Sequence, residues 1–392
     1  MKSCKKNFKN ASNKSKPRPN PNNALIVKKT HTHDRTSKTL VAANGRATLS
    51  RRIRRCSPCK SSSFPADAAL GLDTDYTDGL KRLVGRSCGF WSYRLAAENL
   101  EEFCGIRLSH TLVGDLAQKT ADEIAGKLPD RLDIRNDFQV AQGEVEFTLD
   151  GKCINTRDKD GKPEWREMKV GLVSKRRCGE SATPTEWDSR ELPEFSIASA
   201  FAAIENKEKF QERCQAESRR LGVSEVTSAL GDGAAWIGNI VFQVFGQTAE
   251  CLDIYHALEH VSACGKTLYG HGRPFTDWLD RMRLVLLSEG FAGMDRELSL
   301  LLADDLHPSG RVAVKSLHKY LEKNRQRLHY FERLSAGRAI GSGQVEGACK
   351  NLVGRRLKQT GACWRVDRAN RLAVICALLY ANQWKTYWKN SP

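Results

Sequence analysis

The strongest constraint on the fold is a change of hydrophobic period near residue 144. The stretch EVEFTLDG alternates polar and apolar residues, which predicts a β-strand that ends at Asp150-Gly151. A second strand is expected near Met168–Ser174, and the pair should form a hairpin across the polar loop DKDGKPEW. No third strand is evident before a helix that we expect at 196–220. The middle of the chain therefore contains a β-sheet.

Two shorter strands are expected further along the chain. Val226–Leu230 reads as a buried strand closed by Gly231-Asp232-Gly233, and an apolar helix follows it. Glu250–Ile254 is the second short strand, and residues 256–335 then predict several helices and no strand. Strands that alternate with helices, followed by a long helical stretch, predict an α/β domain that is interrupted late by an all-α insertion.

The region before the sheet has a helical pattern. Ala96, Leu100 and Phe103 are expected on one helical face, Gly105 should end that helix, and Ser109 can cap the next one. A helix, a turn that contains Gly and a capped second helix are typical of a helix-turn-helix DNA reader. An ordinary helical hairpin has the same spacing, so both interpretations stay open.

The stretch IGSGQVEGACKNLVGRRLK, at 340–358, predicts a tight turn and a helix that Ser342 caps. Its apolar residues fall on one face, with Glu346 at the edge of that face and Lys350 one turn further on. Arg355 and Lys358 are expected to point away, into solvent or onto a polyanion. A long Trp-rich helix should follow, from about Asp367 to Trp388.

The charge of the chain is unevenly distributed. The sequence has 63 Lys and Arg against 46 Asp and Glu, a net charge of +17. Residues 1–60 carry a net +16 and residues 338–392 a net +8, so the part between them carries −7. Basic ends around a mildly acidic body indicate a nucleic-acid partner rather than a generally basic surface.

The thirteen cysteines are scattered and odd in number, and the N-terminus has no apolar core that would make it a signal peptide. No apolar run approaches the roughly 18 residues that a membrane span needs. We therefore expect reduced thiols, no membrane, and a cytoplasmic, nucleoid-associated protein.

A CxxC element formed by Cys56 and Cys59 lies among arginines near the N-terminus. A zinc ribbon needs two such pairs, and only Cys4, His31 and His33 stand upstream. Cys56 and Cys59 are therefore possible Zn²⁺ ligands, and they supply only half of the ligands that a ribbon needs.

Three acids occupy comparable positions: Asp150 and Asp232 at strand ends, and Glu346 on a helix. Carboxylates at the ends of neighbouring strands can converge, and a helix on the sheet can add a third. Such a cluster suits two Mg²⁺ or Mn²⁺ ions, which can activate a water or a 3′-hydroxyl for attack on a phosphodiester. No Ser or Tyr is placed like the nucleophile of a recombinase.

Two long blocks resemble signature blocks of bacterial insertion-sequence transposases of the ISKra family, namely GDGAAWIGNIVFQVFGQTAECLDIYHALEH and IGSGQVEGACKNLVGRRLKQTGACW. The resemblance covers roughly residues 46–390. It implies an RNase H-like enzyme with a DDE triad, related to Mutator-type transposases. The N-terminus departs from the family, whose members usually have a fuller set of zinc-ribbon cysteines.

The resemblance also implies roles for particular residues. The catalytic and metal-binding triad falls on Asp150, Asp232 and Glu346, and the family's Asp-x-x-His element falls on Asp253 and His256. The spacing of 114 residues from Asp232 to Glu346 agrees with an insertion. DNA phosphates would be held by the basic residues Lys350, Arg355, Arg356 and Lys358. We expect cleavage and strand transfer on double-stranded DNA, both transposon ends and target, by a homodimer.

The expected organisation has five segments. These are a basic, largely disordered arm with a CxxC element (1–64), a helical, helix-turn-helix-like DNA-binding region (65–135), the first part of an RNase H-like core (138–255), a helical insertion (256–337), and the last part of the core with the C-terminal helix (338–392).

Three alternatives stay open. His256 to His260 spell H-x-x-E-H, the inverted zinc-peptidase motif. Asp253 could replace Asp232 as the second acid of the triad, and His256 could be either structural or a catalytic helper. The chain could also bind DNA without catalysis, as a regulator or a decayed transposase.

Overall fold

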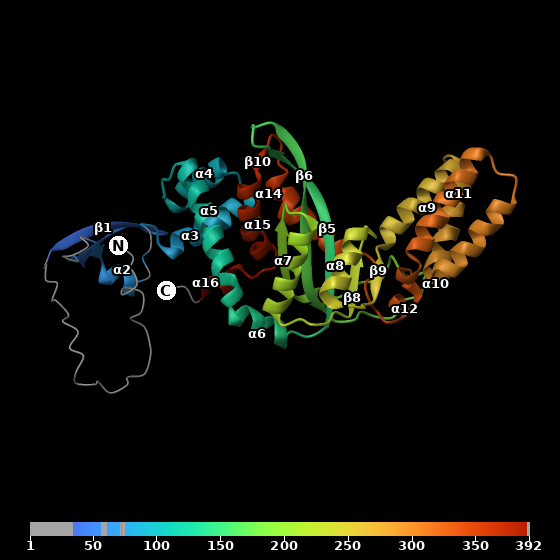
Figure 1. Ribbon diagram of the computed structural model, residues 1–392, viewed down its shortest axis with the longest axis horizontal. Coiled ribbons are helices and arrows are strands. Elements are labelled where there is room, and N and C mark those ends of the chain that lie inside the picture. Colours follow the sequence, from blue (N-terminus) through green and yellow to red (C-terminus); the bar gives the residue numbers. More distant parts are fainter. Residues whose placement is uncertain (1–33, 56–60, 71, 73–74, 390–392) are drawn as a thin grey trace.

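The computed structural model of the chain describes residues 34–55, 61–70, 72 and 75–389. A six-stranded sheet lies at its centre, helices flank the sheet, and a helical arm projects from one end (Figure 1). The prediction of an α/β fold is confirmed. Within the described ranges, no helix is long and apolar enough to cross a membrane.

The central sheet combines antiparallel and parallel strands. β5 (Glu144–Arg157), β6 (Pro163–Arg176) and β7 (Phe195–Ala203) form an antiparallel meander. β8 (Ser228–Gly231) and β9 (Glu250–Leu252) lie on the other side of β5 and run parallel to it. The strand order is β7-β6-β5-β8-β9, and the short β10 (Trp364–Arg365) pairs with the far end of β5.

Two strand predictions need correction. β5 does not end at Asp150-Gly151 but continues to Arg157, because β6 stays paired with it over its whole length. β7 occupies part of the segment that we expected to be helical, and α7 begins only at Lys207, where Asn206 caps it with a 3.0 Å bond from the Lys209 N–H. The small residues of FSIASAFAA hid the alternation of this strand.

Helices cover both faces of the sheet. On one face a hydrophobic core joins strand residues to α3 (Asp78–Phe90), α4 (Tyr93–Cys104), α5 (His110–Lys127), α15 (Val366–Tyr380) and α16 (Trp384–Lys389). On the other face a second core joins Phe147 and Leu149 to α6 (Leu132–Val140), α7 (Lys207–Leu221) and α8 (Ala235–Phe245). Helices from the two ends of the chain therefore share one core.

The helix pair α4 and α5 begins and ends as expected. Gly105 has a left-handed conformation with φ of 66° and closes α4, and the Ser109 hydroxyl accepts the Leu112 N–H at the start of α5. The expectation that Phe103 joins the buried face is wrong, because its side chain is 72% exposed. A short 3-10 turn, η1 (Leu128–Asp130), follows α5.

The N-terminal segment is more ordered than predicted. β1 (Arg35–Ala42) and β2 (Gly45–Arg52) pair as an antiparallel hairpin, followed by β3 (Arg54–Arg55), β4 (Ser62–Ser63) and α2 (Pro65–Ala69). The turn Ala43-Asn44 leads into Gly45, whose φ of 127° a side chain would disfavour. The prediction of a largely disordered arm is wrong for residues 34–55.

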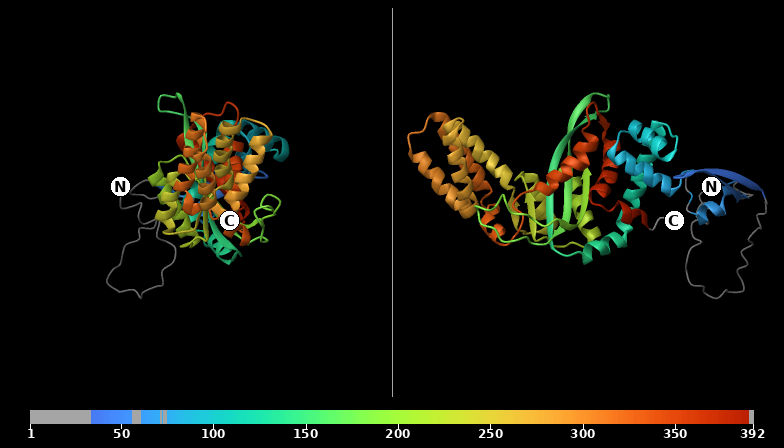
Figure 2. Two further views of the ribbon diagram at one scale, coloured as in Figure 1. Left: turned by 90° about the vertical axis from the view of Figure 1, so that its right-hand side faces the viewer. Right: turned by 180° about the vertical axis from the view of Figure 1, so that it is seen from behind.

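Between β9 and Glu346 the chain forms a helical arm with its own core. It comprises α9 (Ile254–Tyr269), α10 (Arg273–Ala303), α11 (Pro308–Lys323), the turn η2 (Arg325–Arg327) and α12 (Tyr330–Ser335). Figure 2 shows this arm at the end of the molecule opposite β1 and β2.

The last part of the chain returns to the sheet. α13 (Gly343–Ala348) continues through a π-helical turn, η3 (Cys349–Gly354), into α14 (Arg355–Leu357). The expected single long helix is in fact two, because the backbone turns at Ala381-Asn382-Gln383 and Asn382 has a φ of 56°. This break lets α16 fold back onto the core.

Candidate active site

Asp150 of β5 and Asp232, which directly follows β8, lie at the same level of the sheet. Parallel pairing of β5 with β8 places Thr148 opposite Leu230, and the two aspartates follow two residues later on each side. Parallel strands lie about 4.8 Å apart, and residues at the same level point to the same face. The two carboxylates therefore stand side by side, although Asp150 is inside its strand and not at its end.

Backbone groups hold both aspartates. The Gly151 N–H donates to Asp150 Oδ1 at 2.6 Å, and the Ala234 N–H donates to Asp232 Oδ1 at 2.8 Å. The second bond is the Asx turn that an Asp followed by glycine favours. Both side chains are half-buried, so they are fixed but reachable.

The helix that carries Glu346 covers the same face of the sheet. Ile154, which shares a face with Asp150, packs in one core with Val345 and Leu352. Glu346 itself is exposed, and its Oε1 accepts a 3.3 Å hydrogen bond from Ser342 Oγ. The third predicted acid thus belongs to a helix that packs on β5, the strand of Asp150, and on β6.

Cys349, one turn after Glu346, lies close to Asp150. Burial raises the pKa of its thiol, and the negative charge of Asp150 raises it further. The thiol therefore stays protonated and donates toward Asp150. This contact connects α13 and η3 directly to the first acid.

Asp253 has a different environment from the other acids. Its side chain is fully buried, and Oδ1 accepts the N–H groups of Tyr255 and His256 at 2.6 and 3.2 Å. Oδ2 accepts the N–H of Ser342 at 2.5 Å and also its hydroxyl. Asp253 therefore caps α9 and fastens it to the turn before α13, which favours a structural role over that of a triad acid.

The same contacts correct the expected role of Ser342. Its hydroxyl makes no cap bond to α13 but bonds to Asp253 and Glu346. The buried carboxylate of Asp253 is the stronger acceptor.

Tyr320 of α11 is a side chain of the helical arm that lies near Asp232 and Asp253. Burial raises the pKa of Tyr320 to about 12, and the charges of Asp232 and Asp253 add to the shift. Its buried hydroxyl has no hydrogen-bond partner among the described residues. No local pattern points to this residue, since Tyr320 is about 90 positions from Asp232.

The H-x-x-E-H motif does not form a metal site in the structure. His256 Nδ1 pairs with Glu259 at 3.3 Å, and the His260 ring stacks on Tyr320 with centroids 3.7 Å apart. The pKa of His260 is lowered, mainly by burial. These contacts explain the histidines without a zinc ion.

No group of three His, Cys, Asp or Glu side chains that could hold a metal is found in the described part of the chain. Asp150, Asp232 and Glu346 nevertheless provide the hard oxygen donors that Mg²⁺ requires. An ion shared by all three would require these side chains to come closer together than they stand in the structure. Cys56 and Cys59 lie outside the described residues.

The four basic residues predicted to hold DNA differ in their exposure to solvent. Lys350, Arg355 and Lys358 are exposed, as expected. Arg356 is only 2% exposed, its Nε donates to the Cys88 carbonyl at 2.6 Å, and its guanidinium stacks over Trp364. The prediction that Arg356 contacts DNA is wrong, because a cation enclosed in this way cannot reach a phosphate.

Two aromatic residues extend the exposed basic surface. Arg355 lies over the Phe90 ring at 5.2 Å, and Arg86 approaches the same ring at 5.9 Å. Lys358 lies 5.6 Å from the exposed ring of Trp165 on β6. A cationic surface with aromatic rings is suited to a nucleic acid.

Helix α5 is packed against α3, α4 and α15. Its exposed side carries Asp115 and Asp122, which pair with Arg368 and Arg371 of α15. Acids on this side are unfavourable for a helix that would enter the major groove. The contacts of α5 are those of a helical hairpin built into the core.

A scan against protein-family models and a search of curated proteins found no match to this chain.

Proposed function

We propose that the chain is a DNA-cleaving and strand-transferring enzyme, the transposase of a bacterial insertion sequence, with an RNase H-like core. The observation that carries the proposal is the level placement of Asp150 on β5 and Asp232 directly after β8, with the helix of Glu346 packed on β5. Three antiparallel strands followed by two parallel strand–helix units are what such a core requires. The helical arm between β9 and α13 accounts for the wide spacing of the acids.

In this proposal Asp150, Asp232 and Glu346 hold two Mg²⁺ ions. When bound, such ions activate the attacking oxygen and stabilise the leaving oxygen of a phosphodiester. The backbone N–H groups of Gly151 and Ala234 keep the two aspartates oriented. Lys350, Arg355 and Lys358 hold the DNA backbone beside them. We expect a homodimer on double-stranded DNA, because a transposon has two ends.

The test is cleavage of end DNA by the Asp232→Asn protein. The substitution removes a charged metal ligand but no phosphate contact, so cleavage should be lost while DNA affinity changes little. Asp277→Asn, an exposed aspartate of α10, is the matched control and should cleave normally. Full cleavage by the Asp232→Asn protein would refute the assignment. DNA binding without cleavage by the unmodified chain would favour a DNA-binding regulator.

A further inference from the structure

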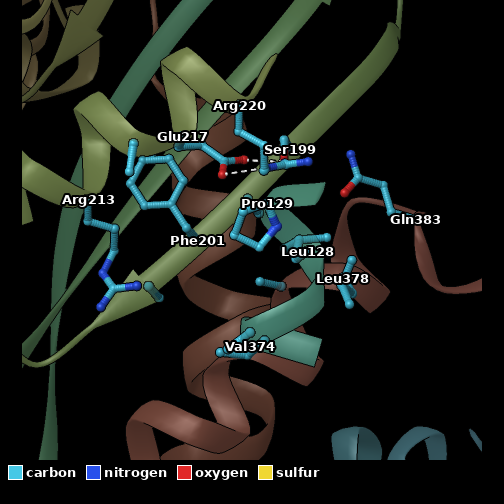
Figure 3. A pocket seen from close by; sticks show the side chains of 15 residues that line it. Leu128, Pro129, Ser199, Phe201, Arg213, Glu217, Arg220, Val374, Leu378 and Gln383 are labelled. Carbon is cyan, nitrogen blue, oxygen red and sulfur yellow. Dashed lines mark hydrogen bonds and ion pairs between the residues drawn. The ribbon is translucent and has the colours of Figure 1, made fainter. Parts of the chain in front are cut away.

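A cavity of about 210 Å³ lies at the free edge of the central sheet (Figure 3). β7 is the last strand on that side and pairs only with β6. α7 bounds the cavity on one face of β7, α15 bounds it on the other, and the end of α5 with η1 closes it opposite the strand. Most of the wall is apolar, with Ala125, Leu128, Pro129, Val374 and Leu378 among the lining residues.

Side chains satisfy the backbone at both ends of this edge. Gln383 Nε2 donates to the Ala198 carbonyl at 2.9 Å. Further along, Asn370 Oδ1 accepts the Ile204 N–H at 2.8 Å, and its Nδ2 donates to the Ile204 carbonyl at 3.4 Å. Ala198 and Ile204 are therefore residues whose backbone groups point away from β6.

The residues between them expose backbone groups to the cavity. Alternate residues of an edge strand turn their N–H and C=O outward. Ala200 and Ala202 share the alternation of Ala198 and Ile204, so their outward groups face the cavity that they line. No described residue forms a hydrogen bond with these groups. Two donors and two acceptors thus stand at fixed spacing.

A buried arginine forms part of the cavity wall. The Arg220 side chain is 5% exposed, its Nε donates to Glu217 at 2.9 Å, and its Nη2 donates to Ser199 at 2.8 Å. Its Nη1 is buried and lacks a partner among the described residues. Figure 3 shows Arg220, Glu217 and Ser199 together, with Leu128, Leu378 and Val374 away from them. Because Nη1 has almost no accessible surface, it lies within the wall of the cavity and does not contact its contents.

The charges at the cavity are balanced. Glu217 neutralises Arg220, and Glu205 pairs with Arg213 at 2.5 Å. A ligand therefore needs hydrogen-bonding groups more than a charge. A cavity of about 150 Å³ is enough for benzene, so this one can hold a ring with one polar substituent.

We propose that this cavity binds a small uncharged molecule with a ring-sized apolar body and a carboxamide group. The carbonyl oxygen accepts from an outward N–H of β7 and the amide N–H donates to an outward carbonyl, as the Asn370 carboxamide does at Ile204. An added peptide strand fits less well, because Gln383 and Asn370 already occupy the edge on both sides. This inference does not depend on the proposed function.

The first test uses benzamide as the probe and full-length protein. Saturation-transfer NMR should show binding, and hydrogen exchange of the peptide that contains Ala200 and Ala202 should slow several-fold when benzamide is added. Ala216→Phe places a ring at the mouth from an exposed position on α7 and should abolish both effects. Ala303→Phe, at an exposed alanine of α10, is the matched control and should bind normally. Absence of binding at millimolar benzamide, or equal binding by Ala216→Phe, would overturn the proposal.

A second probe tests the hydrogen bonds themselves. Toluene has a ring of the same size but no group that can pair with the outward backbone groups, so it should bind roughly tenfold more weakly than benzamide. Equal binding of the two probes would contradict the assigned contacts.

Discussion

At the scale of residues, burial separates the neighbouring arginines 355 and 356. Arg356→Ala should lower the free energy of unfolding by about 2–4 kcal/mol, because it empties the space beside Trp364 and leaves the Cys88 carbonyl unpaired. Arg355→Ala should change stability by less than about 0.5 kcal/mol but weaken DNA binding. Urea denaturation and a binding titration measure the two effects, and the opposite pattern would reverse our assignment.

Tyr320 provides a second prediction at this scale. Its folded-state pKa of about 12 lies above the usual value of about 10, so its contribution to stability is complete below pH 10 and is lost as the pH rises toward 12. Tyr320→Phe should therefore be at least as stable at pH 7, since the hydroxyl has no partner, and should lose less stability by pH 11. Urea denaturation at both pH values checks this. The exposed Tyr255→Phe is the control and should match the unmodified protein.

At the scale of elements, one hydroxyl connects the helical arm to the helix of Glu346. Ser342→Ala should lower the free energy of unfolding by about 1.5–3 kcal/mol, because the buried Asp253 carboxylate loses a charge-assisted bond. Cleavage should slow as well, since α13 loses its anchor. Ser335→Ala, at an exposed position near the end of α12, is the control. A fully stable Ser342→Ala protein would show that the backbone N–H alone holds Asp253.

The elements also show how much of the fold can be predicted from the sequence. The hairpin of β5 and β6, the short strands β8 and β9 and the helical stretch after them follow from periodicity, because large apolar residues mark their buried positions. β7 escaped detection because alanine and serine carry little hydrophobic contrast. The alignment of Asp150 with Asp232 follows from strand register, which depends on pairing between distant segments of the chain. Arg355 is exposed and Arg356 is buried because of packing against α3, and no local sequence pattern contains that information.

At the scale of the whole molecule, basic residues from two distant parts of the sequence meet beside α14. Arg86 of α3 and Arg355 of α14 share the Phe90 ring, so a basic surface continues from the candidate active site onto the N-terminal helices. Most of the acidic residues lie between residues 60 and 338 of the sequence. Such a layout should orient a polyanion along the basic surface.

The N-terminal residues 1–33 allow this electrostatic interpretation to be tested. They contain nine Lys and Arg and no Asp or Glu. If on the order of ten cations of the full chain reach phosphates, log K should fall against log salt with a slope near −9, and each lost contact makes the slope about 0.9 less negative. A chain that begins at Asp34 should thus show a flatter slope. Replacing residues 1–33 by a Gly/Ser segment of equal length controls for chain length and should give the same flattening. An unchanged slope in both proteins would mean that this segment does not touch DNA, and that the phosphate contacts belong to the folded body, where Lys350, Arg355 and Lys358 are then the residues to substitute.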